Sequence, residues 1–134
     1  MSESILVVED NIDNQDLTRI LLECEGFEVQ MAADAAQALS MLRGYRPRLI
    51  LMDVQLPEMD GLELARWLRQ DPSLQDVIIV ALSAYAMDAE KANAMAAGCD
   101  GYITKPINTR TFASTVRQHL LLRAEPAAGL CQVL

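Results

Sequence analysis

The chain has 134 residues, a length that predicts a single domain. Hydrophobic residues make up 51% of the sequence and charged residues 22%, which is enough apolar material for a packed core and too much for an intrinsically disordered chain. The net charge of −8 argues against direct binding to nucleic acid, because sequence-independent affinity for phosphate backbones depends on an excess of Lys and Arg.

The few thiol and imidazole groups also exclude some classes of protein. Three well-separated cysteines, Cys24, Cys99 and Cys131, and the lone His119 support neither a disulfide framework nor a zinc site. The first residues lack the pattern of a secretory signal, and no apolar run approaches the length of a membrane helix. We therefore expect a cytoplasmic protein, in a reducing environment, that does not bind membranes.

Short runs of β-branched and aliphatic residues alternate with longer stretches of helical period. The runs at residues 5–8, 49–52 and 77–82 are almost continuously apolar, which is typical of strands buried on both faces. The runs at residues 27–31 and 101–104 are weaker candidates of the same kind. The pattern predicts five strands in total.

Apolar side chains spaced three and four residues apart predict one helix after each strand. The alternation of strand and helix predicts an α/β fold in which a parallel sheet carries helices on both faces. We expect one domain over residues 1–122 and a short flexible C-terminal tail over residues 123–134, where the pattern lapses. The expected core-facing residues are, in chain order, Leu17, Ile20, Leu21 and Cys24; Ala35, Ala38, Leu39 and Leu42; Leu62, Leu64, Ala65 and Leu68; Ala89, Ala92, Ala96 and Ala97; and Phe112, Val116, Leu120 and Leu121.

Residues with special backbone preferences agree with these helices. Gly26 and Gly98 follow the first and fourth helical stretches, where a helix end favours a left-handed residue. Asp34 stands where the second helix needs an N-cap, and either Asn108 or Thr109 where the fifth needs one.

Polar side chains follow four of the predicted strands at their carboxyl ends. Glu9 and Asp10 follow the first strand, Asp53 the third, Ser83 ends the fourth and Lys105 follows the fifth. Because ligands of open parallel sheets bind outside the carboxyl ends of the strands, these side chains are expected to converge. Three clustered carboxylates raise one another's pKa unless a cation is bound, and their hard oxygen atoms suit Mg²⁺.

Each of these residues also has a purely structural interpretation. Acidic residues such as Glu9 and Asp10 are common at helix starts, Lys105 alone is typical of a solvated amine, and Ser83 can cap the following turn. Asp53 favours a functional site, because an unpaired carboxylate at the mouth of a central strand would be costly.

The sequence resembles the receiver domain of two-component response regulators over residues 3–122. The resemblance implies a flavodoxin-like (βα)5 fold, doubly wound, whose five parallel strands have the order 2-1-3-4-5. The motifs that carry it, in the family's order and spacing, are Ile-Leu-Val-Val-Glu9-Asp10-Asn11, Leu-Met-Asp53-Val-Gln-Leu-Pro57-Glu-Met-Asp60-Gly61, Ala-Leu-Ser83-Ala and Tyr102-Ile-Thr-Lys105-Pro106.

The resemblance implies that Asp53 accepts a phosphoryl group in a Mg²⁺-dependent reaction. It implies that the metal is bound by Asp10, by Asp53 and by the backbone carbonyl of Gln55, with Glu9 acting through water. Such a site makes chemical sense, because phosphoryl transfer needs positioning and neutralisation of the charged oxygens.

The resemblance also implies a switch. Lys105 and Ser83 would contact oxygens of the phosphoryl group, and Tyr102 would rotate inward as Ser83 moves toward it. These changes would alter the protein-binding face formed by the fourth helix, the fifth strand and the fifth helix. Without the motif, Tyr102 would be interpreted as a half-buried strand aromatic. Gln55 and Tyr85 occupy positions that tune phosphoryl lifetime in the family.

The implied function is signalling rather than catalysis on an external substrate. The phosphoryl group would come from a histidine kinase or a histidine phosphotransfer protein, and the output would be contact with a downstream protein by a monomer or a weak, phosphorylation-dependent homodimer. One alternative is the receiver segment of a hybrid histidine kinase. A Mg²⁺-dependent phosphohydrolase would need a second acid or base near Asp53, and a pseudo-receiver that only binds partners would not need Asp10, Ser83 and Lys105 as well.

Overall fold

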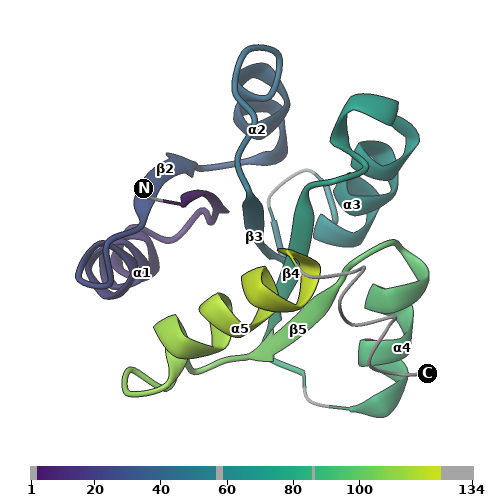
Figure 1. The fold of residues 1–134 in the computed structure, drawn as a ribbon. Coiled ribbons are helices and arrows are strands. Elements are labelled where there is room, and N and C mark those ends of the chain that lie inside the picture. Colours follow the sequence, from purple (N-terminus) through teal and green to yellow (C-terminus); the bar gives the residue numbers. More distant parts are fainter. Residues whose placement is uncertain (1–2, 57–58, 86, 125–134) are drawn as a thin grey trace, which may run out of the picture.

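Strands and helices alternate along the chain in the computed structural model, which describes residues 3–56, 59–85 and 87–124 (Figure 1). The predicted domain boundary at residue 122 falls inside the last helix, and residues 125–134 of the predicted tail lie outside the described residues. The elements are β1 (Ser4–Val8), α1 (Ile12–Glu23), β2 (Glu28–Ala32), α2 (Ala35–Met41), β3 (Leu49–Asp53), α3 (Gly61–Gln70), a 3₁₀ turn η1 (Pro72–Leu74), β4 (Ile78–Ser83), α4 (Asp88–Ala96), β5 (Gly101–Thr104) and α5 (Phe112–Ala124).

The five strands form one parallel sheet of order β2-β1-β3-β4-β5, which confirms the predicted fold. The direction in which successive strands are added reverses between β1 and β3, and open sheets bind ligands at such a point. The register pairs Asp53 with Leu82 and Ser83 with Thr104, so the carboxyl ends of β3, β4 and β5 lie next to one another.

Two apolar cores lie on opposite faces of the sheet (Figure 1). Leu6 and Val8 of β1 pack on the side of α2, α3 and α4, whereas Ile5 and Val7 pack on the side of α1 and α5. The central strands β3 and β4 have no exposed position, as expected for strands covered on both faces. In the part of the chain that the structure describes, no helix is long and apolar enough to cross a membrane.

The predicted helix ends are largely confirmed. Gly26 and Gly98 have φ of 89° and 106°, the left-handed conformation that favours glycine. The Asp34 carboxylate accepts a hydrogen bond from the Gln37 amide at the start of α2. Asn108 caps a turn that precedes α5 by accepting from the Arg110 amide, and α5 itself begins at Phe112.

The core-facing residues of α2 and α3 are as predicted, but the predicted core face of α1 is largely wrong: of its four residues only Leu21 packs against the core, where it is partly buried. Leu17, Ile20 and Cys24 are exposed, and α1 buries Thr18 and Leu22 instead. Both sets of residues fit helical spacing, so periodicity alone does not decide which side of the helix meets the sheet.

The predicted core face of α4 is also largely wrong. Of its four alanines only Ala97 is buried, together with Ala94, which the prediction omitted. Alanine buries little apolar area, so a stripe of alanines indicates helix without indicating its buried side. In α5 the prediction holds for Phe112, Val116 and Leu120 but not for Leu121, which is exposed.

The start of α3 lies against the end of β3. The Gly61 amide donates to the Val54 carbonyl at 2.8 Å, and a Cβ at Gly61 would overlap the Asp53 carbonyl oxygen and lie 2.8 Å from Val54 Cα. Glycine is therefore required here by close backbone approach.

We expect Gly61→Ala to destabilise the fold by about 1–3 kcal/mol, the usual cost of forcing an extra methyl group into a packed region. Gly44→Ala is the matched control, since a Cβ there meets nothing within 4 Å, and it should change stability by less than about 1 kcal/mol. Urea unfolding followed by circular dichroism measures both, and equal stabilities of the two variants would contradict the steric argument.

The ring of His119, the one histidine of the chain, is half-buried over β5. A Cβ on Gly101 would lie 2.7 Å from the ring Nε2. Burial disfavours the imidazolium and lowers the pKa of His119, although the Asp100 charge partly opposes this shift.

A lowered histidine pKa predicts a direction for the effect of pH on stability. The folded protein prefers neutral His119, so this contribution is complete above the ordinary pKa of about 6.5 and is lost as pH falls toward the lowered value. The stability of the wild type relative to His119→Gln should therefore decrease between pH 7.5 and pH 5. Thermal melts of both proteins across this range measure the difference, and a constant difference would refute the assignment.

Candidate functional site

The predicted site residues meet at the carboxyl edge of the sheet. Glu9, Asp53 and Ser83 are almost completely buried, with exposed fractions of 1%, 3% and 1%. Lys105 reaches them from the residue after β5, and Asp10 lies exposed at the mouth. Polar and ionised groups are rarely buried this deeply without partners, so their contacts determine what the site can do.

Lys105 joins the two buried carboxylates. Its Nζ lies 2.5 Å from Asp53 Oδ2 and 3.3 Å from Glu9 Oε1. Partial burial disfavours the charged amine, but the hydrogen bond and charge of Asp53, helped by Glu9, outweigh that effect, so the pKa of Lys105 is raised. The ammonium therefore stays charged and compensates much of the negative charge.

For the carboxyl of Glu9, in contrast to the Lys105 amine, the surroundings disfavour the charged form. Burial is the main reason that the pKa of Glu9 is raised, and the Asp53 charge adds to it, although the Asn11 amide and Lys105 oppose the shift. The amide of Asn11 donates to Glu9 Oε2 at 3.2 Å. One lysine is thus shared between two acidic groups, which leaves an excess of negative charge for a further cation.

The acidic side chains have the spacing and chemistry of a hard-cation site. Carboxylate oxygens of Glu9, Asp10 and Asp53 all lie within 4.8 Å of one another. Oxygen-only ligands with an open, solvent-facing side fit Mg²⁺, which usually keeps several water ligands. The exposed Asp10 is where an ion would enter from solvent.

The loop after β3 completes the surroundings of Asp53. The Gln55 amide donates to Asp53 Oδ1 at 2.8 Å, so each carboxyl oxygen has a different donor. The Gln55 side chain crosses to the next loop, where its Nε2 donates to the Tyr85 hydroxyl at 3.1 Å.

A chain of hydrogen bonds connects Ser83 with Tyr102. The Tyr85 amide donates to Ser83 Oγ at 3.1 Å, and the Tyr102 hydroxyl donates to the Tyr85 carbonyl at 2.6 Å. Ser83 accepts in this contact, which leaves its own O–H to donate elsewhere. The backbone of Lys105 is fixed by donation from its amide to the Ser83 carbonyl at 2.7 Å, and the Lys105–Pro106 bond is cis.

The sequence analysis did not identify two residues that hold the loop of Glu9 and Asp10 after β1 in place. Gln15 Nε2 donates to the Glu9 carbonyl at 2.5 Å, and Asn11 both contacts Glu9 and caps α1 by accepting from the Asn14 amide at 3.0 Å. Asn11 could have been found from the N-cap preference of asparagine, whereas Gln15 gives no signal in the sequence.

The assembled groups suit a reaction at Asp53. A carboxylate next to an ammonium, a hydroxyl donor and a hard-cation site is surrounded by partners for an incoming group with several negative oxygens.

Comparison with known proteins agrees with this chemistry. The family model described as "Response regulator receiver domain" matches residues 5–117. The polar-differentiation response regulator DivK of Brucella anthropi is 40% identical over 120 residues, which cover 90% of this chain and 98% of that protein.

Solved structures show the same likeness in three dimensions. The chemotaxis response regulator CheY4 of Vibrio cholerae superimposes with a TM-score of 0.85 at 28% identity, covering 89% of this chain and 99% of that one. The receiver domain of a sensor histidine kinase from Pseudomonas aeruginosa, solved with a magnesium ion in its active site cleft, has a TM-score of 0.80 at 32% identity and covers 90% and 98%. The chain belongs to the response regulator receiver family of two-component signalling.

Proposed function

We propose that Asp53 accepts a phosphoryl group from a phosphohistidine protein in a Mg²⁺-dependent reaction. The observation that carries this proposal is the position of Asp53, buried at the strand end, 2.5 Å from the Lys105 ammonium and within the acidic cluster. A structural ion pair alone would not need Asp10 at the open side of the same cluster.

The residues of the chain have distinct parts in the transfer. An oxygen of Asp53 attacks phosphorus in line with the histidine nitrogen of the donor, the P–N bond breaks as the P–O bond forms, and the nitrogen keeps the bonding electron pair. Lys105 then pairs with a phosphoryl oxygen instead of with Asp53 alone, and the Ser83 O–H donates to another. A bound Mg²⁺, held by Asp10 and Asp53 with Glu9 acting through water and the Gln55 carbonyl beside it, would supply charge neutralisation at the phosphoryl oxygens.

The hydrogen bonds of Ser83 suggest how the change reaches the surface. If the Ser83 hydroxyl turns toward a phosphoryl oxygen, the Tyr85 amide loses its present hydrogen-bond acceptor, and the loop that carries Tyr85 can shift. The carbonyl of the same residue, Tyr85, accepts the hydrogen bond from the Tyr102 hydroxyl. Tyr102 is then released to move inward. The surface that changes would be α4, β5 and α5, and α4 has no side-chain N-cap bond to hold its first turn in place.

The donor protein is proposed to dock beside Lys105. A cavity of about 400 Å³ opens there between α1 and the loop that leads to α5. Exposed apolar side chains of α1 continue from this cavity, which suits a helical partner such as a histidine kinase or a histidine phosphotransfer protein. The cavity is lined by Asn14, Leu17, Ala84, Lys105, Pro106 and Ile107.

The remaining features of the proposal concern the cellular setting. We infer a cytoplasmic switch, acting as a monomer or a weak phosphorylation-dependent homodimer, that contacts a downstream protein and hydrolyses only its own aspartyl phosphate. A pseudo-receiver is disfavoured because Asp10, Asp53, Ser83 and Lys105 are not merely present but brought to one edge of the sheet.

Incubation with acetyl phosphate and Mg²⁺ should add one phosphoryl group to the wild-type protein and none to Asp53→Asn, because the amide lacks the nucleophilic oxygen. Intact-mass spectrometry measures the addition, and its loss in acid, in which phosphoserine is stable, distinguishes acyl phosphate from phosphoserine. Phosphorylation of Asp53→Asn to the wild-type extent would show that Asp53 is not the acceptor.

Mg²⁺ should stabilise the folded wild-type protein, because the ion binds the native acidic cluster and not the unfolded chain. Saturation at about 100 times the dissociation constant corresponds to about 2.7 kcal/mol. Asp10→Ala should lose most of this gain, whereas Asp16→Ala, which removes an exposed carboxylate outside the cluster, should keep it. Thermal melts with and without Mg²⁺ measure the gain, and equal gains in the two variants would remove Asp10 from the metal site.

A further inference from the structure

The backbone carbonyl of Glu9 has a side-chain partner on α1. The Nε2 group of Gln15 donates to this carbonyl oxygen at 2.5 Å, across six residues of sequence. Long side chains of a helix point back toward its N-terminus, so a residue near the start of α1 can reach the loop that precedes the helix. We call this loop, residues 9–11, the acidic loop. Gln15 is half-buried, so the contact is partly shielded from water.

Gln15 holds the acidic loop on both sides of Asp10. Its side chain binds the Glu9 carbonyl, and its backbone amide donates to the Asn11 carbonyl at 2.9 Å. The Glu9 carbonyl and the Asp10 amide belong to one planar peptide group. The orientation of that group sets the direction in which the chain leaves Glu9, and therefore where the Asp10 Cα lies.

The position of the Asp10 carboxylate depends on this backbone. The Glu9 carboxylate has partners of its own, because Oε2 accepts from the Asn11 amide at 3.2 Å and the Lys105 Nζ lies 3.3 Å from Oε1. Within residues 3–56, 59–85 and 87–124, no group hydrogen bonds or forms an ion pair with the Asp10 carboxylate. The course of the acidic loop is therefore what brings this carboxylate within 4.8 Å of the oxygens of Glu9 and Asp53.

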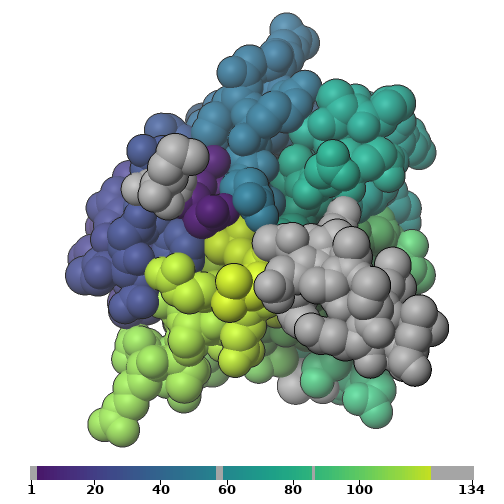
Figure 2. Space-filling model, in the orientation of Figure 1, coloured from purple at the N-terminus to yellow at the C-terminus, as the bar shows by residue number. Residues whose placement is uncertain are grey.

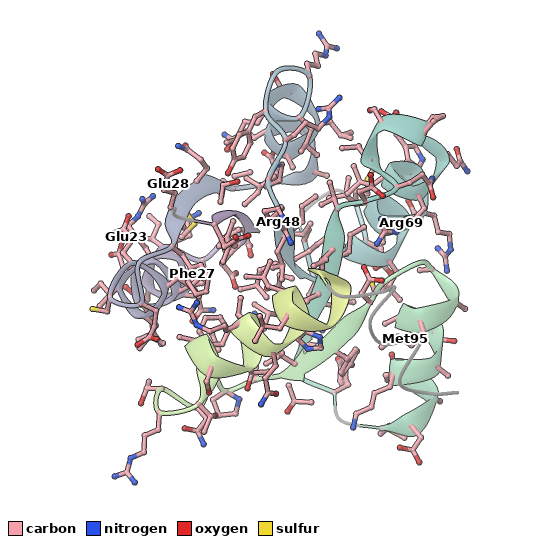
Figure 3. The ribbon with its side chains drawn as sticks, in the orientation of Figure 1. Glu23, Phe27, Glu28, Arg48, Arg69 and Met95 are labelled. Carbon is pink, nitrogen blue, oxygen red and sulfur yellow. The ribbon has the colours of Figure 1, made fainter. Side chains whose placement is uncertain are left out.

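The packing of α1 gives Gln15 a fixed point of attachment. The helix crosses the sheet from the edge that carries the site to the opposite edge, where Figure 3 shows its last residue, Glu23, beside Phe27 and Glu28. One side of the helix is anchored by the fully buried Leu22, and its outer side lies at the surface, in blue-purple in Figure 2. A hydrogen bond to this helix therefore ties the acidic loop to the body of the fold.

The charge of the donor also fits a cation site. The amide of Gln15 is neutral, so it holds the Glu9 carbonyl without placing a positive charge next to Glu9 and Asp10. A Lys or Arg could donate in the same way, but its charge would repel a bound cation. Groups that orient metal ligands commonly change metal affinity by about 10–100-fold when they are removed.

We propose that Gln15 is a positioning residue that sets the affinity of the acidic cluster for Mg²⁺ by fixing the peptide group between Glu9 and Asp10. This inference rests on the proposed function, in which the cluster binds the ion. Gln15 is not itself a ligand, so its replacement should weaken metal binding without removing any carboxylate from the site.

Gln15→Ala and Gln15→Met both remove the donor and keep the backbone hydrogen bond to Asn11. Alanine is the strongest helix former and methionine keeps the length of the side chain, so α1 should remain folded in both. The dissociation constant for Mg²⁺ should rise about tenfold in each variant. Amide chemical shifts of isotope-labelled protein, titrated with magnesium chloride, measure this constant.

Two control variants separate positioning from a general loss of stability. Gln70→Ala removes an exposed glutamine at the end of α3, on the opposite edge of the sheet, and should leave the Mg²⁺ dissociation constant unchanged. Leu21→Ala removes a partly buried apolar side chain from α1 itself. It should lower the melting temperature and also leave the dissociation constant unchanged.

The rate of labelling by acetyl phosphate gives a second readout. In the Gln15 variants the Mg²⁺ concentration that gives half of the maximal rate should rise about tenfold. The maximal rate at saturating Mg²⁺ should stay within about twofold of the wild type, because the reacting groups of Asp53, Ser83 and Lys105 are unchanged.

An unchanged dissociation constant in both Gln15 variants, in a wild type that binds the ion, would overturn the inference and leave the proposed metal site intact. A change in Gln15→Ala alone would also overturn it, because the effect would then come from lost side-chain volume. An equal change in Leu21→Ala would assign the effect to stability and overturn it as well. A wild type that does not bind Mg²⁺ would remove the proposed metal site, and this inference with it.

Discussion

The interaction on which the site depends is the sharing of one ammonium by two buried carboxylates. Removing charges from water is costly, and their mutual attraction offsets the cost only when the geometry is good. Lys105 contacts both Asp53 and Glu9, yet one positive charge cannot neutralise two negative ones. The raised pKa of Glu9 reflects the remaining imbalance. A cation bound beside Asp10 would relieve this imbalance, so the electrostatics that make clustered carboxylates costly also make the cluster suitable for Mg²⁺.

The rest of the fold holds this cluster in position. Parallel strands in register bring Glu9, Asp53 and Ser83 to one edge, and apolar layers on both faces exclude water below them. Gly61 lets α3 begin against the Asp53 carbonyl, and hydrogen bonds from Gln15 and Asn11 hold the acidic loop. The central strands are covered on both faces, so under the proposed function a change of charge at Asp53 would be taken up by Ser83, by Tyr102 and by the loop that carries Tyr85.

Exposed apolar side chains lie near this site on both faces of the sheet. One group of them lies on α1 and reaches the cavity beside Lys105 through Leu17. Exposed apolar side chains also occur at the two ends of α4, where the N-cap residue Met87 and Met95 are 66% and 46% exposed. Contiguous exposed apolar surface commonly marks a contact with another segment or protein. Under the proposed function, the α1 surface would meet a donor protein that approaches Asp53, and α4 would report a change transmitted through Tyr85 and Tyr102. Input and output would then use opposite faces of the sheet.

The sequence by itself determined the strands, the sheet class and the identity of the polar residues at the strand ends, because buried parallel strands and their terminal carboxylates leave a strong local pattern. Only the tertiary structure decided which sides of α1 and α4 are buried, since Leu17, Ile20 and Cys24 fit a core-facing stripe as well as Thr18 and Leu22 do. It also decided the contacts of Gln15, the approach of Gly61 to Asp53 and the packing of His119 over Gly101. These depend on which segments meet in space, and residues far apart in the chain carry no local signal of that meeting.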